Sequence, residues 1–393
     1  MHHTDNGDRD DDHRYKDVKG ENVDDDENAP YRALDEDVRD FWVPREVKRL
    51  RHPITALTFL RDYVQPSIPV IFSKGSGLLD QWQGVERWKE WEWVVGRVGE
   101  ETIVSVNVTP DGRGDAILEM RKEIERKVEE EKRPEERRMA FGAFVDILLH
   151  GEDEGGRESG REEGVFYLSQ QNDNMRVDFP MFLSDGQGTR EEGGEEGQVP
   201  AAGFPIARQV FGHAPDAINL WIGGRRSVSS VHKDPYENMY AVLKGEKHFT
   251  LFPPSDAASF SVAQDLLQAT YHSSPSSRTL SVSIEDQGRR EDGGRIDWID
   301  LEASREGGRE GGRALHPLEV WVKEGEVLYL PALWFHEVTQ TCPTIAVNYW
   351  HDMAFLGPKY VYFNFMQRLG RQRQRRREGG REGGKEGGKE GGE

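Results

Sequence analysis

The stretch of chain after residue 165 constrains the fold most, because it consists largely of short segments rich in aromatic and β-branched residues. Such segments are typical of β-strands. Two tight turns between them, Lys244-Gly245-Glu246 and Lys323-Glu324-Gly325, predict hairpins. Many short antiparallel strands joined by tight turns favour a sandwich or jelly roll. The expected strands span residues 166–169, 217–222, 227–233, 239–243, 247–252, 318–322, 326–330, 337–340 and 344–350.

The chain before this region has a mixed pattern, and we expect residues 41–150 to form an N-terminal α/β part of the same folded unit. Apolar residues at helical spacing predict a helix over 56–64, and a tryptophan-rich stretch predicts another over 87–98. Residues 69–72 and 102–108 are expected to be strands. An amphipathic helix over 360–369 closes the ordered chain.

Segments dominated by Gly, Glu and Arg interrupt this pattern and lack the apolar residues needed to bury a face. We expect a disordered acidic arm over 1–40 and a disordered tail over 371–393. Similar tracts at 151–164, 186–197 and 285–312 are expected to be exterior loop insertions, which folds tolerate because loop-closure entropy grows only slowly with length.

The net charge of −20 argues against direct nucleic-acid binding, which needs a basic surface. Cys342 is the single cysteine, so no internal disulfide can form and a reducing compartment is expected. The sequence shows neither a secretory signal nor an apolar run long enough to span a membrane. We therefore expect a soluble intracellular protein, cytoplasmic or nuclear.

A candidate metal site begins at His232 and Asp234, which lie two residues apart in an expected strand and so point to the same face. His336, after an apolar strand and turn, is the best third ligand. Two histidines and one carboxylate make a facial triad that suits Fe(II), with open positions for a co-substrate and O₂. His232 alone would more simply be a hydrogen-bonded core histidine, and only the three residues together favour the metal site.

A zinc-protease site is the alternative for His336. Its motif would need a second histidine at position 340, where the chain has Gln340.

Lys247 is a candidate for binding a co-substrate. It opens a strand near His232, where a buried cation could bind the far carboxylate of a dicarboxylate co-substrate. The simpler alternative is that Lys247 faces solvent in a hairpin.

Several motifs resemble those of the cupin-like JmjC hydroxylases, and the resemblance covers most of residues 41–370. It implies a double-stranded β-helix, with 165–370 as the catalytic domain, and Fe(II), 2-oxoglutarate and O₂ as cofactor and co-substrates. The motifs are Asn219-Leu220-Trp221-Ile222-Gly223, His232-Lys233-Asp234-Pro235-Tyr236-Glu237-Asn238-Met239-Tyr240, Gly245-Glu246-Lys247-His248-Phe249, Tyr329-Leu330-Pro331-Ala332-Leu333-Trp334-Phe335-His336 and Ala346-Val347-Asn348-Tyr349-Trp350.

The resemblance also implies roles for individual residues. His232, Asp234 and His336 match the iron ligands, and Lys247 matches the residue that binds the distal carboxylate of 2-oxoglutarate. Ser229 stands where threonine is more usual, but it keeps the hydroxyl group. The remaining residues that match polar positions of the co-substrate pocket are Tyr167, Asn238 and Asn348.

The activity that the resemblance implies is hydroxylation of a lysine side chain in a GTP-binding protein, by a homodimer. A histone-tail peptidase activity has also been attributed to such proteins. Two other functions stay open: histone lysine demethylation by the same iron chemistry, and a non-catalytic binding protein on a cupin scaffold. The latter would predict a broken triad or a missing lysine, and all four residues are present.

Overall fold

The structure is a computed structural model of the chain. It describes residues 29–386, except 81, 83, 114–115, 121–127, 134, 152–163, 185–196, 274–279, 285–294 and 310–313. The expected acidic arm up to residue 28 and the expected insertion at 186–197 therefore lie almost entirely outside the described residues. So does most of the tract at 151–164.

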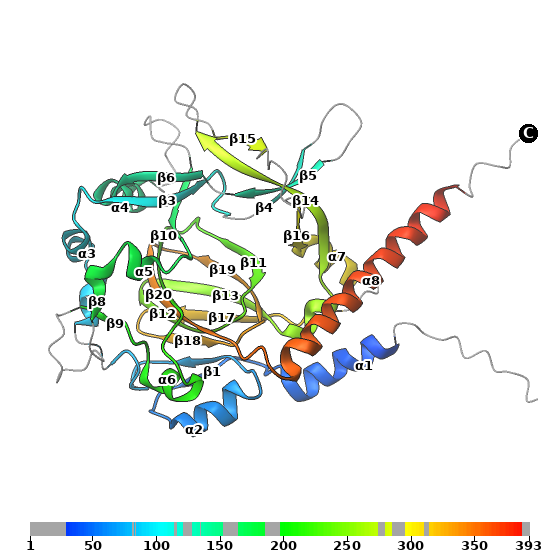
Figure 1. The fold of residues 1–393 in the computed structure, drawn as a ribbon, viewed down its shortest axis with the longest axis horizontal. Coiled ribbons are helices and arrows are strands. Elements are labelled where there is room, and N and C mark those ends of the chain that lie inside the picture. Colours follow the sequence, from blue (N-terminus) through cyan, green and yellow to red (C-terminus); the bar gives the residue numbers. More distant parts are fainter. Residues whose placement is uncertain are drawn as a thin grey trace, which may run out of the picture.

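Two facing β-sheets form the centre of the molecule (Figure 1). The larger sheet has nine strands in the order β1-β2-β18-β12-β20-β10-β7-β3-β6, and the smaller has four in the order β11-β19-β13-β17. This is the mainly β, cupin-type double-stranded β-helix that the strand pattern and the resemblance predicted. The strands of the larger sheet are β1 (Lys48–Leu50), β2 (Val70–Phe72), β18 (Val327–Leu330), β12 (Tyr236–Lys244), β20 (Thr344–Asp352), β10 (Ala217–Gly223), β7 (Val165–Leu168), β3 (Ile103–Thr109) and β6 (Glu135–Ala140). Those of the smaller sheet are β11 (Ser229–Lys233), β19 (Phe335–Gln340), β13 (Glu246–Phe252) and β17 (Leu318–Lys323).

The two predicted tight turns exist, but they do not close hairpins. The turn at Gly245 carries the chain from β12 in the larger sheet to β13 in the smaller one. The turn at Gly325 returns it from β17 to β18. Both glycines have positive φ angles, +80° and +82°, which side-chain-bearing residues rarely adopt. The predicted turns are confirmed. The predicted hairpins were wrong, because each turn joins two strands that belong to different sheets.

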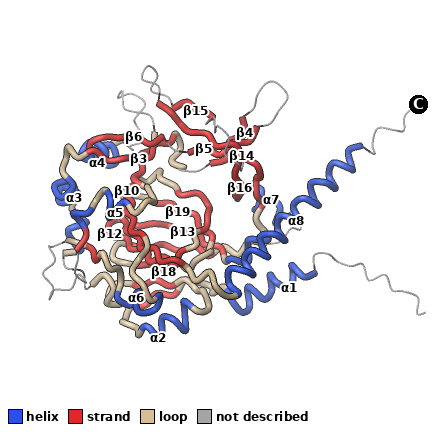
Figure 2. Tube along the Cα trace, in the orientation of Figure 1, coloured by secondary structure: helices blue, strands red, loops and turns tan. Residues whose placement is uncertain are grey.

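Helices cover the outer face of the larger sheet and one end of the smaller sheet (Figure 2). The predicted helix at 56–64 is α2 followed by a π-helical turn, and the tryptophan-rich stretch becomes a 3₁₀ turn and α3. One apolar core lies between the larger sheet and its helices, a second between the two sheets, and a third between the smaller sheet and α8. The helices are α1 (Ala29–Asp37), α2 (Ala56–Phe59), α3 (Trp91–Val98), α4 (Phe141–His150), α5 (Asn174–Val177), α6 (Pro205–Phe211), α7 (Leu301–Arg309) and α8 (Pro358–Glu386).

A third sheet, which the sequence did not predict, stands beside the sandwich (Figure 1). Its order is β15-β14-β5-β4, and β16 pairs with β14. The expected insertion at 285–312 is thus partly structured, because β16 and α7 lie within it. The strands are β4 (Ala116–Met120), β5 (Val128–Arg133), β14 (Ser261–Ser273), β15 (Leu280–Ile284) and β16 (Arg295–Asp300); a short pair, β8 (Leu183–Ser184) and β9 (Val199–Pro200), lies apart.

The prediction of disorder at the two ends of the chain was wrong for the residues that the structure describes. Helix α1 lies within the expected arm, and α8 continues through 371–386 of the expected tail. The Arg- and Gln-rich residues that begin this tail are good helix formers. Two contacts hold this part of α8: Arg373 lies 4.8 Å above the Tyr31 ring, and the Gln374 side chain bonds the backbone of Val262. None of the described helices is long and apolar enough to cross a membrane.

Candidate active site

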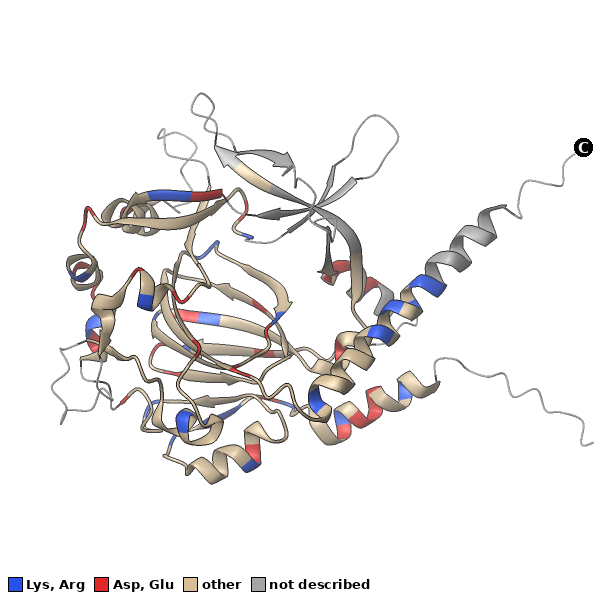
Figure 3. Ribbon diagram, viewed as in Figure 1, with Lys and Arg blue, Asp and Glu red and all other residues tan. Residues whose placement is uncertain are grey.

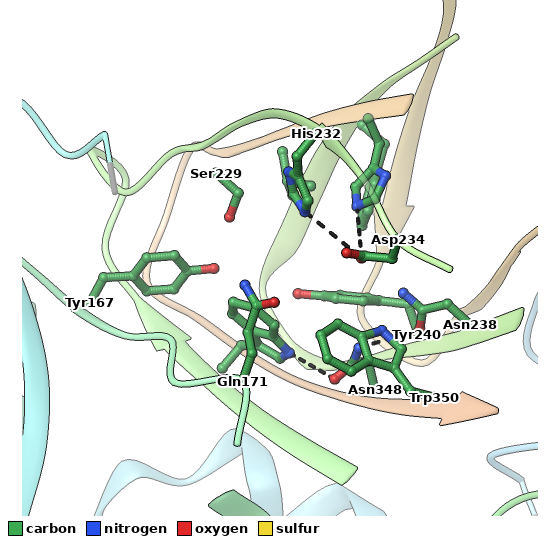
Figure 4. A pocket seen from close by; sticks show the side chains of 13 residues that line it. Tyr167, Gln171, Ser229, His232, Asp234, Asn238, Tyr240, Asn348 and Trp350 are labelled. Carbon is green, nitrogen blue, oxygen red and sulfur yellow. Dashed lines mark hydrogen bonds and ion pairs between the residues drawn. The ribbon is translucent and has the colours of Figure 1, made fainter. Parts of the chain in front are cut away.

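The three candidate metal ligands meet inside the sandwich, at the end of β11 (Figure 4). His232 on β11 and His336 on β19 are direct cross-strand partners. Asp234 follows β11, and its Oδ2 lies 3.8 Å from His232 Nε2 and 3.6 Å from His336 Nε2. The two imidazole centroids are 4.3 Å apart. Residues far apart in sequence are therefore brought together by strand pairing.

The backbone sets the orientation of both imidazoles. His232 Nδ1 lies 2.6 Å from the carbonyl of Ser230, and His336 Nδ1 lies 3.1 Å from that of Trp334. A carbonyl can only accept a hydrogen bond, so Nδ1 carries the proton in each ring. Each Nε2 is then left with a lone pair directed at the Asp234 carboxylate, which is the tautomer that a metal ligand needs.

Asp234 is fixed to the His336 strand through an unusual turn. The N–H of Leu333 donates to the Asp234 carbonyl at 2.9 Å. Leu333 has φ +71°, a left-handed conformation that an apolar side chain seldom adopts. This strained position sits three residues before His336 and connects both sides of the triad, so tertiary packing holds it in place.

The triad fits a divalent metal. Its ligand atoms all lie within 4.8 Å of one another, and they combine two imidazole nitrogens with one carboxylate. Burial and the neighbouring His232 lower the pKa of His336 to about 4, so this imidazole is neutral at physiological pH. Neutral histidine and ionised carboxylate are the forms that bind metal.

A small cavity adjoins the triad. Its volume of about 20 Å³ holds roughly one water molecule. Of the predicted site residues, Tyr167, Ser229, Asn238 and Asn348 line it together with the triad. Six further residues, which the sequence did not predict, also line the cavity: Gln171, Trp221, Tyr240, Phe249, Val338 and Trp350.

Strand periodicity could have found some of these. Tyr240 lies two residues after Asn238 on β12, and Trp350 two residues after Asn348 on β20, so each shares a face with a predicted site residue. Val338 stands in the same relation to His336 on β19. Gln171 lies in the loop after β7, and no local pattern marks it.

Lys247 is buried, with 1% of its surface exposed, so the solvent-facing alternative is wrong. Lys247 is not among the residues that line the small cavity, but its Nζ lies 3.1 Å from the hydroxyl of Tyr167, which lines it. Burial lowers the pKa of Lys247 to about 7. Burial likewise raises the pKa of Tyr167 far above its usual value, and a hydrogen bond with Ser229 opposes this.

The two predicted asparagines form the floor of the site on the larger sheet (Figure 4). Asn348 Nδ2 donates to Asn238 Oδ1 at 3.4 Å, while Trp221 Nε1 donates to Asn348 Oδ1 at 2.9 Å. Both asparagines are almost fully buried. Because their amides are held in a fixed orientation, they offer preorganised polar groups beside the triad.

A histidine–carboxylate triad inside a double-stranded β-helix defines the class of cupin-type metal-dependent oxygenases. Comparison with known proteins agrees, since the model of the cupin-like domain family matches residues 56–357. The chain belongs to the cupin-like JmjC family. Proteins of this family use Fe(II) and 2-oxoglutarate.

Three relatives match nearly the whole chain. The bifunctional peptidase and (3S)-lysyl hydroxylase JMJD7 of Homo sapiens is 35% identical over 84% of this chain and 92% of its own length. The lysine-specific demethylase JMJ32 of Arabidopsis thaliana is 32% identical over 85% and 89%, respectively. JmjC domain-containing protein E of Dictyostelium discoideum is 30% identical over 88% and 94%.

Proposed function

We propose that this protein is an Fe(II)- and 2-oxoglutarate-dependent protein hydroxylase that acts on a lysine side chain. The observation that carries the proposal is the convergence of His232 Nε2 and His336 Nε2 on the Asp234 carboxylate. Fe(II) held by these three residues would activate O₂ for insertion of one oxygen atom into a C–H bond, with 2-oxoglutarate oxidised alongside.

The chain's own residues would then bind and orient the co-substrate. We assign the distal carboxylate of 2-oxoglutarate to Lys247, the one fully buried lysine among the described residues. The present cavity is too small for a five-carbon dicarboxylate. Binding therefore requires Tyr167 to move off Lys247, after which its hydroxyl and that of Ser229 can also donate to the carboxylate. Asn238 and Asn348 would orient the other end.

Lysyl hydroxylation is favoured over other reactions by the relative named as a (3S)-lysyl hydroxylase, which is the most identical of the three. We propose a GTP-binding protein as the substrate, as the resemblance to cupin-like JmjC hydroxylases implies. We also propose that the enzyme works in the cytoplasm and nucleus.

Lysine demethylation is the second candidate, because another relative of similar coverage is named as a lysine-specific demethylase. Both reactions oxidise a C–H bond of a lysine residue: hydroxylation oxidises a carbon of the side chain, and demethylation oxidises an N-methyl carbon. They differ in which carbon is held at the metal. The peptidase activity in the human relative's name is less favoured, since no second histidine follows His336 at zinc-protease spacing.

Mass spectrometry distinguishes these candidates. Purified protein with Fe(II), 2-oxoglutarate and O₂ is offered an unmethylated lysine peptide from a GTP-binding protein and a methylated histone peptide. We expect addition of one oxygen to the first, coupled to succinate formation, and none with an Asp234→Ala variant. Formaldehyde release from the histone peptide alone would favour demethylation, and peptide cleavage would favour a peptidase.

We further propose that two copies of the chain form a dimer through the start of α8. Several apolar side chains are exposed there, which is unusual for a monomer surface. Leu356 is 95% exposed and Tyr362 67% exposed. Phe355, Val361 and Phe365 complete this apolar patch.

A further inference from the structure

The turn at 331–334, between β18 and β19, forms hydrogen bonds with two members of the triad. The Leu333 N–H donates to the Asp234 carbonyl at 2.9 Å. The Trp334 carbonyl accepts from Nδ1 of His336, at 3.1 Å. A shift of this turn would therefore displace the backbone of one candidate ligand and rotate the imidazole of another.

The carboxylate of Glu237 holds this turn in place. Glu237 Oε2 accepts from the Ala332 N–H at 3.1 Å and from the Tyr329 hydroxyl at 2.7 Å. Ala332 and Leu333 are consecutive, and Glu237 follows Asp234 by three residues. Two successive N–H groups of the turn are thus bonded to the segment that carries Asp234. These contacts surround Leu333, whose φ of +71° needs support from its neighbours.

Glu237 is a buried charge in a part of the fold with few charges. Most of the length of the two central sheets carries neither acidic nor basic side chains (Figure 3). Glu237 is only 8% exposed, and a buried carboxylate is costly unless it is paired and hydrogen-bonded. Glu237 Oε1 pairs with Lys359 of α8 at 3.1 Å, so both carboxylate oxygens have partners.

Glu237 acts at a distance from the small cavity, since it is not among the residues that line it. Side chains of a strand alternate between its two faces, and the next residue, Asn238, lines the cavity. Glu237 therefore points to the other face of the larger sheet, where Tyr329 belongs to the core under the helices. An effect of Glu237 on the triad must pass through the turn.

We propose that Glu237 is a positioning residue for the metal site. Its carboxylate holds Ala332, fixes the left-handed conformation of Leu333, and so keeps Asp234 and His336 at the separation that a shared metal needs. This inference rests on the proposed function, because it takes the triad as the Fe(II) site. Without the carboxylate, Leu333 should relax to an ordinary negative φ, and metal binding should weaken although all three ligands remain.

The test measures metal binding directly. Metal-free, full-length protein is titrated with Co(II), whose visible absorption reports both affinity and coordination geometry. For Glu237→Ala we expect about tenfold weaker binding, or about 1.4 kcal/mol, and a changed visible spectrum at saturation. The measurement needs no turnover, so it does not depend on the identity of the substrate.

Two conservative variants separate the hydrogen bonds from the bulk of the side chain. Glu237→Gln keeps one acceptor oxygen for Ala332 and Tyr329, so it should restore Co(II) binding to near the wild-type value. Tyr329→Phe removes only the hydroxyl that fixes Glu237 Oε2, so it should weaken Co(II) binding about threefold. This second variant should fold even if Glu237→Ala does not, because its ring still packs against Phe59.

Glu326→Ala is the matched control. Glu326 is also 8% exposed, and its carboxylate bonds Ser73, Arg49 and the Lys323 N–H. None of these partners belongs to the 331–334 turn. Loss of this buried carboxylate should therefore lower the melting temperature, as Glu237→Ala does, but leave the affinity and spectrum of bound Co(II) unchanged.

The results separate this inference from the proposed function. Normal Co(II) binding by folded Glu237→Ala would overturn the positioning role alone, as would an equal loss in Glu326→Ala or a Glu237→Gln variant no better than Glu237→Ala. If Glu237→Ala does not fold, normal binding by Tyr329→Phe would overturn it. A wild-type protein that does not bind Co(II) would contradict the metal site and both proposals. Dependence of Co(II) binding on Glu237, without oxygen transfer to any peptide, would support the positioning role and contradict the hydroxylase proposal.

Discussion

The Lys247 ammonium and the Tyr167 hydroxyl lie 3.1 Å apart on opposite sheets of the sandwich, and Tyr167 lines the small cavity. Lys247 is therefore buried without a carboxylate partner among the described residues. Desolvation lowers the pKa of Lys247 to about 7. An anion bound beside it would favour the charged form and raise this pKa.

The first prediction concerns this lysine. Lys247→Met keeps the buried aliphatic stem but removes the charge, so the 2-oxoglutarate requirement should rise about ten- to a hundredfold, from loss of roughly 1.5–3 kcal/mol. Metal content should stay normal because the triad is untouched. Succinate formation over a 2-oxoglutarate titration measures the shift. An unchanged requirement would remove Lys247 from the co-substrate site.

A second prediction concerns pH. A dicarboxylate stabilises charged Lys247, so 2-oxoglutarate binding should take up a proton where the free lysine is neutral, above about pH 7. Affinity should be constant below that pH and fall by up to tenfold per unit above it. Calorimetry in two buffers of different ionisation enthalpy should detect an uptake approaching one proton at alkaline pH and little in acid. Lys247→Met should show neither effect.

The third prediction tests the metal site directly. Asp234→Ala leaves two imidazoles without the carboxylate on which they converge, so Fe(II) content and succinate formation should both fall at least about a hundredfold. His232→Ala and His336→Ala should behave alike. Elemental analysis after anaerobic loading measures the metal independently of turnover. Asp178→Ala, an exposed carboxylate far from the triad in sequence, is the control and should bind iron normally. Normal iron content in Asp234→Ala would contradict the assignment.

The fourth prediction concerns the part of the 285–312 tract that packs against the fold. Ile299 and Leu301 pack against the core beneath α8, and Ser304 bonds to the start of β14. Replacing 295–309 with a short Gly/Ser linker should therefore lower the melting temperature by roughly several degrees. Shortening only 310–313 by the same approach is the control. An unchanged melting temperature after the larger deletion would mean that residues 295–309 are an exterior insertion that does not stabilise the fold.

The fifth prediction concerns the apolar patch before and within α8. Leu356→Ser combined with Tyr362→Ser should convert a dimer into a monomer, as light scattering after size-exclusion chromatography can measure. Leu57→Ser is the matched control, because Leu57 is 69% exposed but lies on α2. A wild-type monomer, or a dimer unaffected by the double substitution, would exclude this interface.

The sequence by itself determined the strand-rich fold class, and it predicted the three residues that the structure brings together as a histidine–carboxylate triad. Both depend on local regularities: apolar and aromatic residues mark strands, and a period of two places His232 and Asp234 on one face. The same rule would have extended the site to Tyr240 and Trp350. Family resemblance added the polar residues Ser229, Tyr167, Asn238 and Asn348, which the structure gathers around one cavity.

Only the tertiary structure decided which strands pair and which side chains are buried. The local sequence predicts the turns at Gly245 and Gly325. It does not predict that each turn carries the chain from one sheet to the other, because strand pairing depends on packing between segments remote in sequence. From its strand alone, the Lys247 side chain could point to solvent or to the interior. The structure shows that it points to the interior, where the larger sheet covers it. Likewise, β16 pairs with β14 and α7 packs on it, and the later part of α8 contacts Val262 of β14 and Tyr31 of α1. The glycines of α7 and of the last turns of α8 weaken a helix, so contacts with neighbouring elements supply stabilisation that the local sequence lacks.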